Sequence, residues 1–112
     1  MAYNVLVTPA FKRDLKKLDR QIQRRVFEAL ESLVNDPRPR GIEKLKENPK
    51  FYRLAVGDYR IVYSVDDKKS IIIVCLVRHR KDAYRDIADL NISLIMETVK
   101  PLLIKSPSAA LG

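Results

Sequence analysis

The chain has 112 residues, of which 22 are Lys or Arg and 14 are Asp or Glu, so its formal net charge is +8. This length predicts one domain, and a composition that is 46% hydrophobic and 32% charged is typical of a globular protein and not of a disordered one. With one cysteine, one histidine, no long apolar run and no secretory signal, the sequence predicts no internal disulfide, no thiolate or imidazole metal site, no membrane span and a cytoplasmic location.

The first part of the chain predicts one strand and two helices. Residues 3–7 are rich in β-forming side chains. Thr8 and Pro9 are preferred at the N-cap and the first position of a helix, and Asp19 is a second N-cap candidate. Apolar residues recur at helical spacing, with lysine and arginine between them, so we expect a helical hairpin over 9–18 and 20–35.

The middle of the chain predicts an antiparallel sheet. The β-rich runs 51–56 and 59–65 are separated by Gly57 and Asp58, which is typical of a two-residue hairpin turn. A third run, 70–77, is apolar on both faces and therefore suits a central strand. The expected fold is α+β: an N-terminal strand, a helical hairpin, an antiparallel sheet of three to four strands and a C-terminal helix.

Alternation along the hairpin gives it two different faces. One face is apolar and is expected to cover the helices, whereas the second carries Arg53 and Arg60 and needs no helix to cover it. The basic segment 78–85 follows the third run and is expected to open a short helix near this second face. Clustered cations would suit a phosphate polyanion, although a solubilising basic surface is the alternative.

Three further side chains could carry either chemistry or structure. His79 has basic neighbours, which favour the neutral imidazole that can accept a proton. Tyr84 could pack or take part in a site. Cys75 lies in the apolar run and is expected to be a buried hydrophobe.

The stretch from Phe51 to Tyr63, FYRLAVGDYRIVY, followed by an apolar strand and by HRKDAYR from His79 to Arg85, resembles the RelE/ParE toxin superfamily. The similarity covers about residues 2–88 and is greatest to the RelE branch. It implies a toxin of a type II toxin–antitoxin pair, a cofactor-free and metal-independent endoribonuclease that cuts mRNA in the ribosomal A site by 2′-hydroxyl attack. The implied partners are a small acidic RelB-like antitoxin, the ribosome with its mRNA, and operator DNA only through the antitoxin complex, with no membrane.

The resemblance also implies a site. Arg60 and Arg80 match phosphate-binding arginines of the family, and Tyr84 matches a tyrosine that orients or stacks on the RNA. Ala55 stands where relatives have a second active-site lysine, so His79 becomes the candidate proton acceptor. The implied catalytic residues are therefore Arg60, His79, Arg80 and Tyr84, and the implied substrate-binding residues are Arg53, which matches the first lysine, with Lys46, Arg78 and Lys81.

Two other functions remain open from the sequence. A ParE-like gyrase poison needs no RNA-cutting residues. A non-catalytic basic module that binds only RNA or its antitoxin would also tolerate Ala55.

The C-terminal region has an unusual composition. Between 91 and 104 it carries eight large apolar side chains and two charged ones, which would expose a large apolar patch if the segment were free. We therefore expect a toxin domain over 1–90 and an apolar extension over 91–112. The extension would dock on its own domain or pair two copies, with a disordered tail as the alternative.

Overall fold

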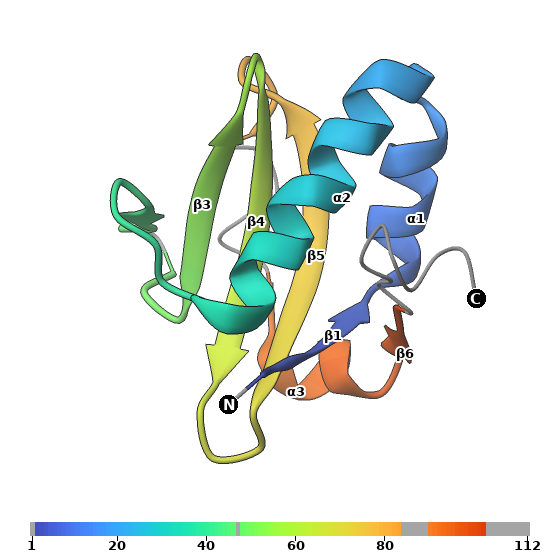
Figure 1. Ribbon diagram of the computed structural model, residues 1–112. Helices are drawn as coiled ribbons and strands as arrows, with labels where there is room; N and C mark the ends of the chain where they lie inside the picture. Colours follow the sequence, from blue (N-terminus) through green and yellow to red (C-terminus); the bar gives the residue numbers. More distant parts are fainter. Residues whose placement is uncertain (1, 47, 84–89, 103–112) are drawn as a thin grey trace, which may run out of the picture.

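The protein is built around one mixed sheet. The computed structural model describes residues 2–46, 48–83 and 90–102. Its elements are, in chain order, β1 (Asn4–Val7), α1 (Pro9–Lys16), α2 (Arg20–Asn35), β2 (Glu43–Lys44), β3 (Phe51–Val56), β4 (Tyr59–Asp66), β5 (Ile71–His79), α3 (Ile92–Met96) and β6 (Lys100–Pro101). Helices α1 and α2 cover one face of the sheet, and α3 lies behind its lower end (Figure 1). The predicted α+β class is confirmed.

Among the described residues, the sheet has six strands in the order β2-β3-β4-β5-β1-β6. Every neighbouring pair is antiparallel except β1 and β5, which run parallel. The two outer strands, β2 and β6, have two residues each, which is too short to leave a periodic pattern in the sequence. No helix among the described residues is long and apolar enough to cross a membrane.

Both predicted helix starts are confirmed by their caps. The Thr8 hydroxyl accepts a hydrogen bond from the Phe11 N–H at 3.0 Å and donates one to the Cys75 carbonyl at 2.7 Å. The Asp19 carboxylate accepts from the Ile22 N–H at 2.9 Å. Because Thr8 is buried and bonds to β5, the cap also fixes the start of α1 against the central strand.

The helices and the first face of the sheet share the larger core. The predicted alternation of the hairpin is confirmed, since Val56, Ile61 and Tyr63 of that face are buried under the helices. The other fully enclosed members come from both helices and from β1 and β5, and they include Phe11, Val26, Leu30, Leu33, Val7, Ile72 and Val74.

The second face of the sheet is not open, and the prediction that no helix covers it is wrong. Phe51 of β3 and Val62 of β4 are buried there with apolar residues of β5, in a second core cluster. The side chains that cover this cluster come from the C-terminal segment and include Leu90, Ile92, Ile95, Met96 and Val99. The segment therefore docks on its own domain, and at the turn end of the second face Ala55 stays exposed.

A β-bulge changes which side chains of β5 share a face. Val62 pairs with Leu76 and Tyr63 pairs with Val74, which leaves Cys75 as the extra residue. Cys75 is buried, as expected, and burial raises the pKa of its thiol to about 12. Beyond the bulge the alternation is inverted, so Arg78 lies on the second face and His79 on the face that carries the helices.

An ion-pair network ties the loop after α2 to the β4–β5 turn. Arg38 donates to both oxygens of Asp67 at 3.0 and 2.9 Å and to the Tyr52 hydroxyl at 2.9 Å, while the Tyr3 hydroxyl donates to Asp67 at 2.7 Å. The bonds from Arg38, and then from Tyr3, hold the pKa of the Asp67 carboxyl below its ordinary value. The network therefore stabilises the fold above the ordinary carboxyl pKa, and this contribution is lost as the pH falls through the lowered pKa.

This network predicts a pH-dependent stability difference. Asp67→Asn should lower the Tm most at neutral pH, and its Tm should converge with that of the unmodified protein as the solution is acidified. Thermal melts over a pH series, with Glu28→Gln on the exposed side of α2 as the control, measure this. A Tm difference that stays constant from neutral to acidic pH would contradict the assignment.

Candidate functional site

Several of the predicted site residues gather at the turn between β3 and β4, where the segment after β5 also lies (Figure 1). The predicted register is confirmed: Val56 pairs with Tyr59 across a turn made by Gly57 and Asp58. Gly57 has a φ of +58°, and a Cβ there would come within 3.0 Å of Nη1 of Arg25 from α2. The positive φ therefore favours glycine at this turn, and the absence of a side chain leaves room for the Arg25 guanidinium.

Two arginines stand directly opposite each other beside this turn. Arg60 on β4 is paired with Arg78 on β5, and its other neighbour is Ala55 on β3. Cross-strand partners lie about 5 Å apart at Cβ, so two like charges in this relation repel each other. A bound anion removes that repulsion, and the small, exposed Ala55 leaves space beside it.

Each arginine of this pair also contacts oxygen atoms of neighbouring residues. Nη1 of Arg60 donates to the carbonyls of Gly57 at 3.0 Å and Tyr59 at 2.9 Å. Nε of Arg78 lies 3.5 Å from the Asp14 carboxylate on α1. For Arg60 these bonds engage one of the guanidinium nitrogens, and the rest of its fork can serve a phosphate.

Arg80 follows β5 and is fixed to the turn through its backbone. Its N–H donates to the Asp58 carbonyl at 2.7 Å, while its exposed guanidinium lies 4.0 Å from the Asp58 carboxylate. The predicted short helix over 78–85 is wrong at its start, because Arg78 and His79 are still in β5 and residues 80–83 form turns. Because β5 ends in a turn at this point, Arg80 lies beside Asp58, the residue that precedes β4.

His79 lies on the helix-bearing face, away from Arg60. Its ring meets the Tyr59 ring edge-on, with centroids 5.5 Å apart, and its Nδ1 accepts a hydrogen bond from the Lys81 N–H at 3.2 Å. With Nδ1 accepting, the neutral ring carries its proton on Nε2. His79 also lines an open hollow of about 520 Å³ together with Tyr59, Asp14 and Lys17, among others.

The tautomer of His79 can be measured. Ring ¹⁵N chemical shifts, at a pH where the ring is neutral, should report a protonated Nε2 and an unprotonated Nδ1. Lys81→Pro removes the backbone N–H that bonds Nδ1, so it should raise the fraction of the Nδ1-protonated tautomer. A ring protonated mainly on Nδ1 in the unmodified protein would contradict this geometry.

The remaining predicted residues are spread out. Arg53 is 9% exposed and forms an ion pair with Glu43 on β2, so the expectation that it projects from an open face beside Arg60 is wrong. Lys46 and Lys81 are exposed. Lys46 follows β2 and is not part of the turn between β3 and β4. Tyr84 lies outside the described residues.

Sequence reasoning missed the cations that the helices contribute. Arg25 of α2 reaches Gly57, and Lys17 lines the hollow beside His79. They belong to a set of seven exposed basic residues along the helical hairpin: Lys12, Arg13, Lys16, Lys17, Arg20, Arg24 and Arg25. The density of cations on the polar face of the predicted hairpin was the available signal. No group of three His, Cys, Asp or Glu side chains in the described ranges could hold a metal ion.

Comparison with known proteins gives a consistent set of relatives. The model of a family described as "ParE toxin of type II toxin-antitoxin system, parDE" matches residues 5–84. Toxin RelG of Mycobacterium tuberculosis is 34% identical over 86 residues, which cover 76% of this chain and 99% of RelG. The archaeal RelE–RelB complex of Pyrococcus horikoshii contains a chain with a TM-score of 0.64 and 30% identity, covering 71% of this chain and 97% of that one. The RelBE2 toxin–antitoxin complex of M. tuberculosis contains another, with a TM-score of 0.64 and 32% identity, over 71% of this chain and 100% of that one.

Proposed function

We propose that this chain, which belongs to the family of ParE toxins of type II toxin–antitoxin systems, is a RelE-like endoribonuclease that cuts mRNA in the ribosomal A site. The relatives with the names RelG and RelE support the RelE branch of the superfamily. The complexes of RelE with RelB support an antitoxin as the partner of this chain, and a small acidic protein would complement its net charge of +8.

The observation that carries the proposal is the pair of arginines opposite each other at the turn end of the sheet. Arg60 and Arg78 share one face, and Arg80 is fixed beside the same turn by its backbone bond to Asp58. Arginines at the end of one sheet and on the turn beside it are suited to a phosphate whose negative charge increases during reaction. The cations of the helical hairpin add a surface for further RNA phosphates.

The proposed reaction needs no metal ion. The 2′-oxygen attacks the adjacent phosphorus, the bond from phosphorus to the 5′-oxygen breaks, and the products are a 2′,3′-cyclic phosphate and a free 5′-hydroxyl. Arg60, Arg78 and Arg80 stabilise the crowded phosphorane that forms between these states. The 2′-hydroxyl loses its proton and the leaving 5′-oxygen gains one, so proton transfer accompanies the attack.

His79 is better suited to binding RNA than to accepting a proton. In the tautomer that the Lys81 N–H favours, Nε2 carries the proton and can donate a hydrogen bond to an RNA phosphate oxygen. The same tautomer has no vacant nitrogen to accept the 2′-proton. We therefore propose that His79 binds RNA through Nε2, in place of the acceptor role that the family resemblance implied.

A ParE-like gyrase poison is the second candidate, because the matching family model is that of ParE toxins and Ala55 stands at a family lysine position. Primer extension on mRNA from cells that express the toxin separates the two functions. The proposal predicts cuts at fixed positions within codons of translated mRNA. Intact mRNA together with gyrase-linked DNA breaks would favour the gyrase poison, and the absence of both would favour a non-catalytic binding module.

A further inference from the structure

A carboxylate of α1 bonds to the edge of β5 next to the arginine site. β1 pairs with β5 over residues 71–74, and α1 lies beside the next part of β5 (Figure 1). There Oδ2 of Asp14 accepts a hydrogen bond from the Val77 N–H at 3.3 Å. Asp14 therefore satisfies the backbone N–H of the residue that precedes Arg78, as a neighbouring strand would.

The same carboxylate oxygen also contacts a side chain of the site. Oδ2 of Asp14 lies 3.5 Å from Nε of Arg78, the next residue along β5. The two side chains are 15% and 25% exposed, so solvent screens this ion pair less than it screens an exposed one. One oxygen therefore fixes both the backbone near the end of β5 and the orientation of the Arg78 guanidinium.

The position of Asp14 in its own helix is unfavourable for a carboxylate. Asp14 lies in the last turn of α1, and the carbonyl oxygens at a helix C-terminus give this end a partial negative charge. Arg13 and Lys16 in the same turn are basic, as the helix dipole favours. The contacts that stabilise the Asp14 carboxylate are therefore those with β5, and not those within α1.

The other two arginines of the site are held in a different way. Arg60 donates to backbone carbonyls. The ion pair of Arg80 with Asp58 is 4.0 Å long, and its side chains are 60% and 67% exposed. An ion pair of that kind does little to fix a side chain. Arg78 differs from both because a half-buried carboxylate contacts its guanidinium.

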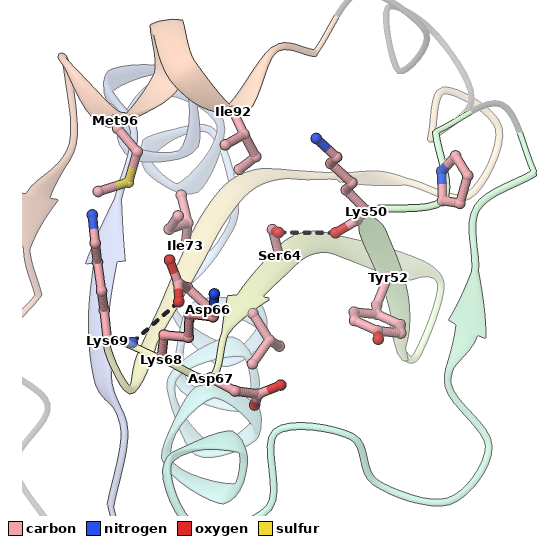
Figure 2. A pocket seen from close by; sticks show the side chains of 12 residues that line it. Lys50, Tyr52, Ser64, Asp66, Asp67, Lys68, Lys69, Ile73, Ile92 and Met96 are labelled. Atoms are coloured by element: carbon pink, nitrogen blue, oxygen red, sulfur yellow. Dashed lines mark hydrogen bonds between the residues drawn. The ribbon is translucent and has the colours of Figure 1, made fainter.

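Two further carboxylates of the sheet lie at its opposite end and serve the fold. Asp66 and Asp67 line a hollow of about 720 Å³ at the β4–β5 turn (Figure 2). Asp66 accepts the Lys69 backbone N–H at 3.1 Å, and Asp67 is held by the Arg38 guanidinium. Their charges stabilise that turn, whereas Asp14 places a negative charge beside the arginine site.

We propose that Asp14 is a positioning residue, which holds the Arg78 guanidinium opposite Arg60 for the reacting phosphate. Arg60 and Arg78 are cross-strand partners and repel each other before RNA binds, so Arg78 needs a contact that keeps it in place. Asp14 acts through Arg78 and needs no contact with RNA. The inference rests on the proposed nuclease, because it concerns how Arg78 meets the phosphate.

The test is Asp14→Asn, which removes the charge and keeps an oxygen that can accept the Val77 N–H. The single-turnover rate of mRNA cleavage at saturating programmed ribosomes should fall by about tenfold or more, because a displaced guanidinium stabilises the phosphorane less. Ribosome binding should be unchanged or tighter, because the variant loses a negative charge. Glu28→Gln, with the same charge change on the exposed side of α2, should cleave at the unmodified rate. Circular dichroism melts confirm that both variants fold.

A double-mutant cycle determines whether Asp14 acts through Arg78. In an Arg78→Ala background, Asp14→Asn should change the cleavage rate by less than about twofold. An equal loss in both backgrounds would overturn the proposal. An unchanged or faster rate for Asp14→Asn alone, or a loss in ribosome binding in place of a loss in rate, would also overturn it.

A measurement without RNA separates this inference from the proposed nuclease. In ¹⁵N NMR spectra of the unmodified protein, the Arg78 Nε–H should exchange with water more slowly than the Nε–H of the exposed Arg40. Asp14→Asn should remove this difference. Equal exchange of the two groups would overturn the inference even in a protein that cleaves mRNA. Slow exchange at Arg78 in a protein that cuts no mRNA would contradict the proposed nuclease and support the contact between Asp14 and Arg78.

Discussion

Replacing Arg60 by alanine should lower the rate of ribosome-dependent mRNA cleavage by about 30- to 1,000-fold, which corresponds to roughly 2–4 kcal/mol of lost transition-state stabilisation. Arg60 stands opposite Arg78 and beside the exposed Ala55, and we propose that its guanidinium binds a phosphate oxygen. The measurement is single-turnover cleavage of mRNA on programmed ribosomes, with toxicity on induction as a second readout. The loss should fall on the chemical step, with ribosome binding changed much less.

The control for this experiment is Arg40→Ala, which removes an exposed arginine from the loop between α2 and β2. It has the same change in net charge, and it should cleave mRNA at the unmodified rate. Arg60→Lys should recover only part of the lost activity, because an ammonium keeps the charge and loses the planar fork. Full cleavage and full toxicity of Arg60→Ala at equal expression would show that Arg60 does not contact the reacting phosphate.

Ending the chain at residue 89 should lower the free energy of unfolding by about 4 kcal/mol, at roughly 1 kcal/mol for each of the half-buried side chains of Ile92, Ile95, Met96 and Val99. The deletion also removes β6, whose residues pair with β1, and it exposes the second core cluster. Denaturant unfolding followed by circular dichroism measures the change. A chain that ends at residue 102 keeps α3 and β6 and serves as the control. Equal unfolding midpoints for the shorter chain and the full-length protein would mean that α3 contributes nothing to stability.

The parts of the fold that the sequence predicted are those with strong local signals. Thr8 with Pro9, and Asp19, start the helices through caps that involve only neighbouring residues. The hairpin register followed from the two-residue turn at Gly57 and Asp58, because turn length fixes which residues pair. The covering of the second face by α3 depends on contacts between distant segments, and the sequence left open whether that segment docks on its own domain or on a second copy.

The bulge at Cys75 is the feature that most affected the site and left no signal. Residues 71–77 are apolar on both faces, so no polar residue marks where the alternation changes. The one-residue shift places Arg78 on the face of Arg60 and moves His79 to the other face. The sequence motif therefore predicted the correct end of the sheet. It could not predict that Arg78 and His79 lie on opposite faces of the sheet.

The predictions for the two arginines of the hairpin had different outcomes for a similar reason. Arg60 could be placed from the register alone, and the structure agrees. Arg53 alternates onto the same face, but Glu43 on the short strand β2 binds it in an ion pair, and no local pattern predicts that strand. Arg25 reaches the turn only because α2 packs across the sheet, so its place at Gly57 follows from tertiary structure.

The most direct test of the proposed function is the chemistry of the RNA ends. Purified protein is added to ribosomes that carry a defined mRNA with an empty A site, and the fragments are analysed for their terminal groups. We expect a 2′,3′-cyclic phosphate on the upstream fragment and a 5′-hydroxyl on the downstream fragment, both lost with Arg60→Ala. Intact mRNA, or fragments that end in a 3′-hydroxyl and a 5′-phosphate, would contradict it.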